Sequence, residues 1–303
     1  MYLVGVREAT HVGHPSMAIP VQIDHYVSSL CIFMLVNAYV KPIYRKDIMT
    51  TTVGSLGRLC NGLIRNIAVS MLSEKFDLKT TYQYADEMKA LGLSLFSGRK
   101  AYPVVFRLND ANYIEVFNRS ILLANLHTVS EHCYLQTPEI SALVYSFLRR
   151  AAIYTSIMAA NPYKQFYKNN DFTFLHVRLT DVRHYSPGSK YFLKAIAATQ
   201  FSTLYIASDN LEDEIIKEIT AVYPNAVLFS ATPIQTLQFG STCRNIILSG
   251  GSFSAMIGML ALFSTVQYPE SSNIGYDSVN GIHNRQWCGD MFSGHGWTMV
   301  SYK

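Results

Sequence analysis

The feature that most constrains the fold is an alternation of short β-prone runs and helical segments over residues 172–260. The expected strands are 172–177, 203–207, 226–229 and 245–248, and the expected helices are 191–198, 211–223, 234–243 and a segment from 253. Strands that alternate with helices of about ten residues predict a parallel, doubly wound sheet with right-handed crossovers. The loops after the strands then open on one edge of the sheet, where open α/β folds bind ligands.

The first half of the chain begins with a β-prone run at 48–53, a glycine-containing loop and a helix. Leu63, Ile67 and Met71 follow at i, i+4 spacing, which predicts an amphipathic helix that ends near Phe76. The segment 82–150 is less regular, with a short strand at 102–106 and a helix at 140–151. We therefore expect four parts: an N-terminal extension over 1–48, a first domain over 49–160, a second over 161–270, and an irregular tail over 271–303.

Composition excludes some classes of function. The chain has 303 residues, 49% of them hydrophobic and 15% charged, and a formal net charge of +4. Its Lys and Arg residues are scattered, with no basic run interleaved with aromatic residues, so no nucleic-acid partner is expected. The five cysteines form no CxxC pair and have no His at zinc spacing, which favours a reduced, cytoplasmic setting and predicts no metal site.

Residues 25–40 lack Lys, Arg, Asp and Glu. The stretch is shorter than the roughly 20 residues that span a bilayer, and Lys41, Arg45 and Lys46 follow it, which is the wrong side for a type II anchor. A buried helix or an appended segment is favoured. The alternative is a membrane-anchored enzyme in the lumen of the secretory pathway.

Three loops at the expected strand ends carry polar groups that suit a phosphate. The first is 176–181, in which Arg178 offers a planar donor fork. The second holds Asp209, which can accept from a base or a ribose. The third precedes a helix, whose amino end attracts anions; its candidate residues are Gly251, Ser252, Phe253 and Ser254.

Each of these features also has a purely structural explanation. Asp209 or Asn210 can cap the following helix, and the glycine pair at 250–251 can form a tight turn. Arg178 and Asp181 can form a structural ion pair, and His176 can be a hydrogen-bonded core residue.

The order of these motifs resembles that of the GDP-fucose-dependent fucosyltransferases, the superfamily of α-1,2-, α-1,6- and protein O-fucosyltransferases. The loop 54–61 (GSLGRLCN) looks like their amino-terminal glycine loop, and 176–181 (HVRLTD) is similar to their HxRRxD motif. The runs 205–209 (YIASD) and 249–254 (SGGSFS) resemble their next strand and their Ser/Phe/Ser loop. The resemblance covers about residues 49–265.

The resemblance implies a GT-B type enzyme, with two Rossmann-like doubly wound domains that face a cleft. It implies an inverting, metal-independent transfer of fucose from GDP-fucose to a hydroxyl of a glycan or protein, with no cofactor. The first domain would face the acceptor and the second would bind the nucleotide sugar. By the same resemblance, Arg178 would hold the diphosphate, Gly57 and Asn61 would face the cleft, and Ser252 and Ser254 would lie beside the phosphates. His176, Asp209, Gly251 and Phe253 would complete the donor site.

Two departures from the family pattern keep alternatives open. Leu179 stands where the family has its second Arg, for which Arg183 in the same loop can substitute. Cys60 and Gly62 stand where the family has Gly and Gln. The alternatives are a donor with another sugar, such as xylose or rhamnose, and a catalytically decayed nucleotide-binding protein. No spacing dictates the general base; His184 is the first candidate, because its ordinary pKa near 6.5 suits proton acceptance, and Asp181 is the second.

Overall fold

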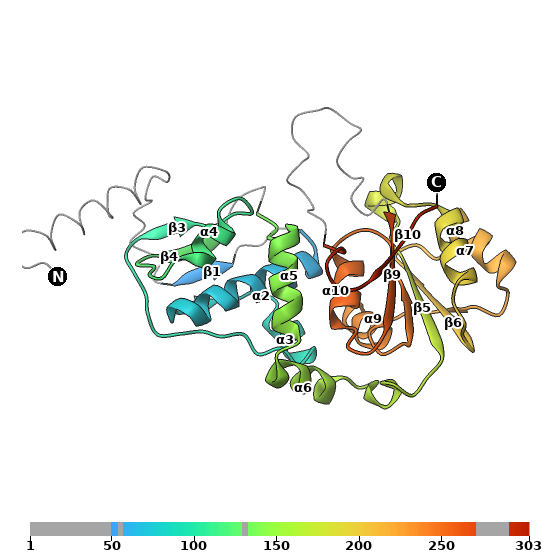
Figure 1. Cartoon of the computed structure of the whole chain (residues 1–303), viewed down its shortest axis with the longest axis horizontal. Helices are drawn as coiled ribbons and strands as arrows, with labels where there is room; N and C mark the ends of the chain where they lie inside the picture. Colours follow the sequence, from blue (N-terminus) through green and yellow to red (C-terminus); the bar gives the residue numbers. More distant parts are fainter. Residues whose placement is uncertain (1–49, 54–56, 129–132, 271–290, 303) are drawn as a thin grey trace, which may run out of the picture. The chain divides into compact units, whose positions relative to one another are not determined.

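The computed structural model describes residues 50–53, 57–128, 133–270 and 291–302, which form an α/β fold with two parallel sheets (Figure 1). Both sheets lie within one compact unit, Ile43–Lys303. The α/β class expected from the sequence is confirmed. The expected extension 1–48, with its apolar stretch 25–40, lies outside the described residues.

The first sheet has the strand order β2-β1-β4-β3, with all neighbours parallel. Its strands are β1 (Thr51–Val53), β2 (Thr80–Thr81), β3 (Val105–Arg107) and β4 (Asn125–Thr128). The helices of this part of the chain are α2 (Leu59–Phe76), α3 (Ala85–Ala90), α4 (Tyr113–Asn118), α5 (Pro138–Leu148) and α6 (Ala151–Ala160). The chain runs outward from β1 to β2 and returns to the other side of β1 through β3 and β4, so the strand order reverses between β1 and β4.

The second sheet has the order β10-β9-β8-β5-β6-β7, again with all neighbours parallel. Its strands are β5 (Phe172–Val177), β6 (Thr203–Ser208), β7 (Val227–Leu228), β8 (Asn245–Ile247), β9 (Thr265–Pro269) and β10 (Thr298–Val300). Its helices are α7 (Ser189–Ala197), α8 (Glu214–Val222), α9 (Pro233–Gly240) and α10 (Ser252–Leu260), with two short 3-10 helices, η1 (Lys164–Phe166) and η2 (Thr180–Tyr185). Here the order reverses between β5 and β8.

Helices cover both faces of the second sheet. Leu175 and Val177 of β5 are fully buried in one cluster with Ile196 of α7 and Ile216 of α8. The alternate residues point to the other face, where the Phe174 ring packs edge-on against Phe239 of α9 and His176 stacks on Phe253 of α10. The strand is therefore buried on both faces, as expected for a doubly wound parallel sheet.

Helix α2 is more deeply buried than an amphipathic surface helix. It contacts β1, α5 and α10, and nearly all of its residues from Cys60 to Ser73 are buried, including the charged Arg65. A helix enclosed by neighbours on several sides is apolar around most of its circumference. Helix α2 is therefore buried on more sides than the single apolar face that the i, i+4 spacing predicted.

Three further differences separate the structure from the sequence-based expectations. The helix expected at 140–151 is two helices, α5 and α6, because the chain turns at Arg149, whose guanidinium donates to the carbonyl oxygens of Met259 and Ala261. The strands β4 and β9 were not predicted. The tail expected to be irregular over 271–303 contains β10, which extends the second sheet beside β9.

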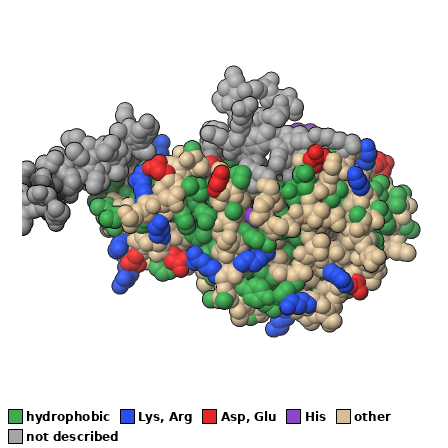
Figure 2. Space-filling view, viewed as in Figure 1, with side chains coloured by type: hydrophobic (Ala, Val, Ile, Leu, Met, Phe, Trp, Pro, Cys, Tyr) green, Lys and Arg blue, Asp and Glu red, His purple; other side chains and the backbone are tan. Residues whose placement is uncertain are grey.

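Within the described ranges, no helix has both the length and the apolar composition needed to cross a membrane. On the face drawn in Figure 2, the Lys and Arg side chains are dispersed rather than gathered into a continuous strip. This distribution agrees with the scatter of basic residues along the sequence.

Candidate functional site

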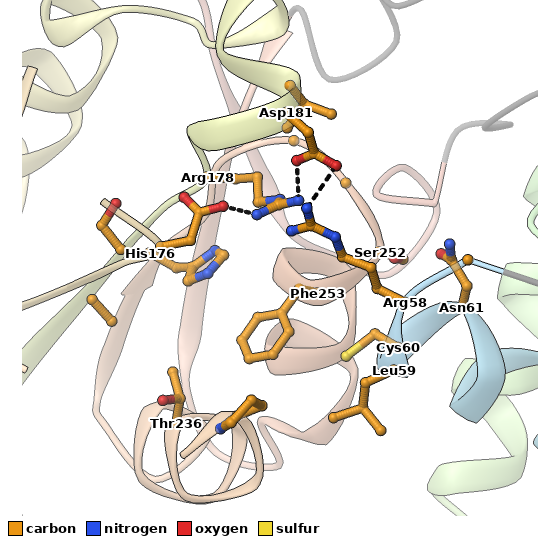
Figure 3. Close-up of a pocket in the computed structure, with 18 of the residues that line it drawn as sticks. Arg58, Leu59, Cys60, Asn61, His176, Arg178, Asp181, Thr236, Ser252 and Phe253 are labelled. Carbon is orange, nitrogen blue, oxygen red and sulfur yellow. Dashed lines mark hydrogen bonds and ion pairs between the residues drawn. The ribbon is translucent and has the colours of Figure 1, made fainter. Parts of the chain in front are cut away.

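A pocket of about 560 Å³ is lined by the loops that follow both points of strand-order reversal. From the first sheet come residues after β1, including Gly57 and Asn61, and residues after β4, Tyr134 and Gln136. From the second come residues after β5 and β8, such as Arg178 and Ser252 (Figure 3). In open parallel sheets, ligands bind at such reversal points, because adjacent loops there diverge and leave a crevice.

Most of the sequence-predicted site residues lie together in this pocket. The predicted residues that line it are Gly57, Asn61, His176, Arg178, Asp181, Asp209, Gly251, Ser252 and Phe253. Three predicted residues are not among the lining residues: Arg183, His184 and Ser254. The expectation that the three loops of the second sheet open on one edge is confirmed.

Arg178 lies at the centre of a charged network. Its guanidinium pairs with the carboxylates of both Asp181 and Asp209, and its side chain is only 15% exposed. Burial and the nearby Arg58 guanidinium lower the pKa of Arg178, while Asp181 opposes that shift. The Arg178–Asp181 ion pair that the sequence allowed is therefore formed, and it lies inside the pocket.

Asp209 holds the loop that follows β5. Its Oδ1 accepts from the backbone N–H of Leu179 at 2.7 Å, and its Oδ2 accepts from the Thr180 hydroxyl at 2.6 Å. It does not cap the next helix, because α8 begins at Glu214 and its N-cap is Asp213, whose carboxylate accepts from Ile215 N at 3.0 Å. With these bonds and the Arg178 ion pair, Asp209 acts mainly on the position of Arg178.

His176 is a buried, neutral residue. Its Nδ1 lies 2.7 Å from the Ser254 hydroxyl, which lies 3.0 Å from the hydroxyl of Ser249, and Ser249 in turn accepts from the backbone N–H of Arg178 at 3.0 Å. Burial, assisted by the Arg178 charge, lowers the pKa of His176 to about 3. Ser254 is fully buried and does not line the pocket; its hydroxyl bonds to the His176 ring and so holds the ring in position.

The loop residues expected to supply a second cation and a base lie elsewhere. Arg183 makes a two-pronged ion pair with Asp213, from its Nε at 2.6 Å and its Nη2 at 3.1 Å. His184 is exposed and its ring lies 3.8 Å from that of Tyr185. Leu179, at the position of the family's second Arg, is fully buried in the core cluster with Leu175 and Val177.

Arg58 supplies the second guanidinium of the pocket and was not predicted from the sequence. Its Nη2 lies 2.9 Å from Asp181 Oδ2, and it lines the pocket from the N-cap position of α2. Its place directly after Gly57 in the glycine loop was the available signal. Figure 3 shows Arg58 and Arg178 side by side, joined through Asp181.

Two helices direct their amino ends at the pocket. Helix α2 begins at Leu59 and α10 begins at Ser252, and neither has a side-chain cap or an acidic residue in its first turn. Gly251, with φ of +91°, precedes α10 in a conformation that favours glycine, and a Cβ there would meet no atom within 4 Å. The free N–H groups and the helix dipoles favour an anion at this place.

The other reactive groups of the pocket are not arranged for metal or thiol chemistry. Among the residues that the structure describes, no three His, Cys, Asp or Glu side chains are placed to hold a metal ion. Cys60 is almost fully buried in the first turn of α2, and burial raises the pKa of its thiol, so it is not a thiolate at neutral pH. Independence of metal remains a prediction.

A comparison of the chain with protein-family models finds no match, and a comparison with curated proteins finds no significant match.

Proposed function

We propose that this protein is a glycosyltransferase that moves fucose from GDP-fucose to a hydroxyl of a glycan or protein, with inversion at the sugar carbon. The observation that carries the proposal is the pairing of two guanidinium groups, Arg58 and Arg178, with the amino ends of α2 and α10 around one pocket. These groups together suit a diphosphate better than a single carboxylate. The arrangement of two Rossmann-like domains that face a cleft is part of the same proposal.

The pocket also has room and surfaces for a nucleoside. Its volume of about 560 Å³ lies within the range of roughly 300–1,000 Å³ typical of small-molecule sites. The end of the pocket near β6 and β7 is lined by apolar side chains beside small polar ones, namely Ala207, Ser208, Phe229, Ser230, Ala231 and Pro233. An aromatic ring with neighbouring hydroxyl and backbone groups suits a purine base and its ribose.

In the proposed reaction, the acceptor oxygen attacks the anomeric carbon as the bond to the diphosphate oxygen breaks. The departing diphosphate gains negative charge, which Arg58, Arg178 and the amino end of α10 stabilise. The acceptor hydroxyl loses its proton to a base. Of the two residues considered for that role, Asp181 lines the pocket and His184 does not, so Asp181 is the proposed base.

Asp181 accepts from the guanidinium groups of both Arg58 and Arg178. Phosphate oxygens that bind Arg58 and Arg178 would take over these donors. The carboxylate would then be released close to the reacting carbon.

A thermal-unfolding screen with GDP, UDP and their sugar derivatives tests the proposal. A ligand at 100 times its dissociation constant stabilises a protein by about 2.7 kcal/mol, so a GDP complex should unfold at a clearly higher temperature. Arg178→Ala should abolish the shift, whereas Arg244→Ala, which removes an exposed ion pair with Asp171, should retain it. A shift with UDP and none with GDP would overturn the donor assignment in favour of another nucleotide sugar, such as one of xylose or rhamnose.

A second candidate function is nucleotide binding without turnover. It is favoured by one observation: the position of the family's second Arg is Leu179, which is buried in the core and cannot reach a ligand. Release of fucose or its transfer to an acceptor separates the two functions. Binding of GDP-fucose with no turnover, at saturating ligand, would favour the binding protein.

A further inference from the structure

The loop after β4 carries a polar wall of the pocket that no motif in the sequence indicated. Tyr134 and Gln136 of this loop line the same pocket as Arg178 and Ser252, which follow strands of the second sheet. Gln136 is only 3% exposed, yet its side chain reaches Asn61 at the start of α2. A buried polar side chain that lines a pocket needs a reason for its position.

A buried carboxylate fixes the shape of this loop. Asp110, 9% exposed, accepts from the backbone N–H of Tyr134 at 3.1 Å and from that of Gln136 at 3.3 Å. Between them, Leu135 has φ of +54°, a left-handed conformation that is costly for a residue with a Cβ. Beneath the loop, the wholly buried Arg65 donates to the carbonyl oxygen of Cys133. Strain that is held in place by several surrounding bonds is characteristic of functional loops.

The loop held in this way places the Gln136 side-chain amide against that of Asn61. Gln136 Nε2 donates to Asn61 Oδ1 at 2.9 Å, which ties the loop after β4 to the first turn of α2. The pair leaves Asn61 Nδ2 as a donor and Gln136 Oε1 as an acceptor, and within the described part of the chain neither makes another hydrogen bond. A hydroxyl group both accepts and donates, so it satisfies these two atoms at once.

We propose that Gln136, paired with Asn61, binds a hydroxyl group of the transferred sugar, and that Asp110 is the positioning residue that sets Gln136. The inference rests on the proposed function, because it places the diphosphate at Arg58 and Arg178 and the sugar beyond it. It adds to that function a part of the pocket that contacts the sugar and is separate from the groups that bind the nucleotide. The amide pair thus selects for a polyhydroxylated group and not for the phosphates.

The test compares the affinities for GDP and for GDP-fucose in each variant. Gln136→Leu should weaken GDP-fucose binding by about tenfold, which corresponds to ~1.4 kcal/mol, and should change GDP binding by less than about twofold. Gln136→Met, which keeps the approximate size of the side chain without adding a charge but loses the donor to Asn61, should show the same selective loss and serves if the leucine variant does not fold. Asp110→Ala should reproduce the selectivity change if it folds. Gln200→Leu, an exposed change outside the pocket, should alter neither affinity.

The outcomes separate the inference from the proposed function. If both Gln136 variants still bind GDP and the ratio of their affinities for GDP and GDP-fucose is unchanged from wild type, the inference alone is overturned. An equal loss for both ligands would overturn it as well, because it indicates a general distortion of the pocket. If the wild-type protein binds neither GDP nor GDP-fucose, both the proposed function and this inference are overturned. If it binds GDP but not GDP-fucose, the assignment of fucose as the sugar and this inference are both overturned.

Discussion

Arg58 Nη2 lies 2.9 Å from Asp181 Oδ2, which joins the N-cap of α2 to the loop after β5. The two side chains follow strands of different sheets and are 62% and 50% exposed, so water screens their attraction. Exposed ion pairs of this kind contribute about 0–1 kcal/mol. A diphosphate with its own charge can therefore displace Asp181 at small cost.

Asp181→Asn should tighten GDP binding. The change removes the carboxylate that competes with phosphate for Arg58 and Arg178, so the affinity should rise by up to about fivefold at low salt. Turnover of GDP-fucose should fall at the same time, because the proposed base is lost. Titration calorimetry and a fucose-release assay measure the two effects, and a weaker GDP affinity in this variant would contradict the competition.

Asp209→Ala should destabilise the protein by about 1–3 kcal/mol, because the Leu179 N–H loses its acceptor inside a packed loop. Asp209→Asn keeps an acceptor oxygen and should recover most of that loss. The matched control is Asp171→Ala, which removes an exposed ion pair with Arg244 and should change stability by no more than about 0.5 kcal/mol. Equal denaturant midpoints for Asp209→Ala and Asp171→Ala would show that Asp209 does not support the loop.

Strands β5 to β8 of the second sheet were predictable, because they are short β-prone runs that alternate with helices of about ten residues, whereas β9 and β10 of the same sheet were not predicted. Phe172–Val177 is buried on both faces, so each of its residues contributes to the pattern. The first sheet gave less information. Its strand β4 is four residues, NLHT, which are too few and too mixed in polarity to show a period of two.

The same contrast applies to the site. Arg178 and Ser252 could be predicted because they follow recognisable strands or precede a helix. Gln136 could not, because its position depends on the buried Asp110 carboxylate and on the left-handed Leu135, neither of which leaves a pattern in neighbouring residues. The partners of Arg183 and Asp209 were also set by tertiary contacts, with Asp213 and with Leu179.

His176 should make stability depend on pH in the acidic range. Its pKa is about 3 in the folded protein and near 6.5 when unfolded, so the unfolded chain binds the proton first as the pH falls. This side chain alone should lower the free energy of unfolding by about 1.4 kcal/mol for each pH unit below pH 6, down to about pH 3. His176→Gln should flatten that slope relative to wild type. His184→Gln, a change at an exposed histidine, should leave the slope unaltered, and identical slopes in all three proteins would refute the assignment.

Gly57→Ala should impair the site more than the fold. Gly57 has φ of +75°, and a Cβ there would lie 2.1 Å from Asn61 Nδ2, so the Asn61 side chain must rotate away and release Gln136. Gly188→Ala is a matched control, because Gly188 has φ of +78° and no atom within 4 Å of the added Cβ.

Both changes force alanine into the left-handed region, so each should cost about 1–2 kcal/mol of stability. GDP-fucose affinity should fall only in the Gly57 variant, because only there does the new methyl group displace a residue of the pocket. Thermal unfolding gives the first comparison and titration calorimetry the second. Equal affinities in the two variants would mean that the orientation of Asn61 does not matter for the ligand, since the backbone cost is common to both.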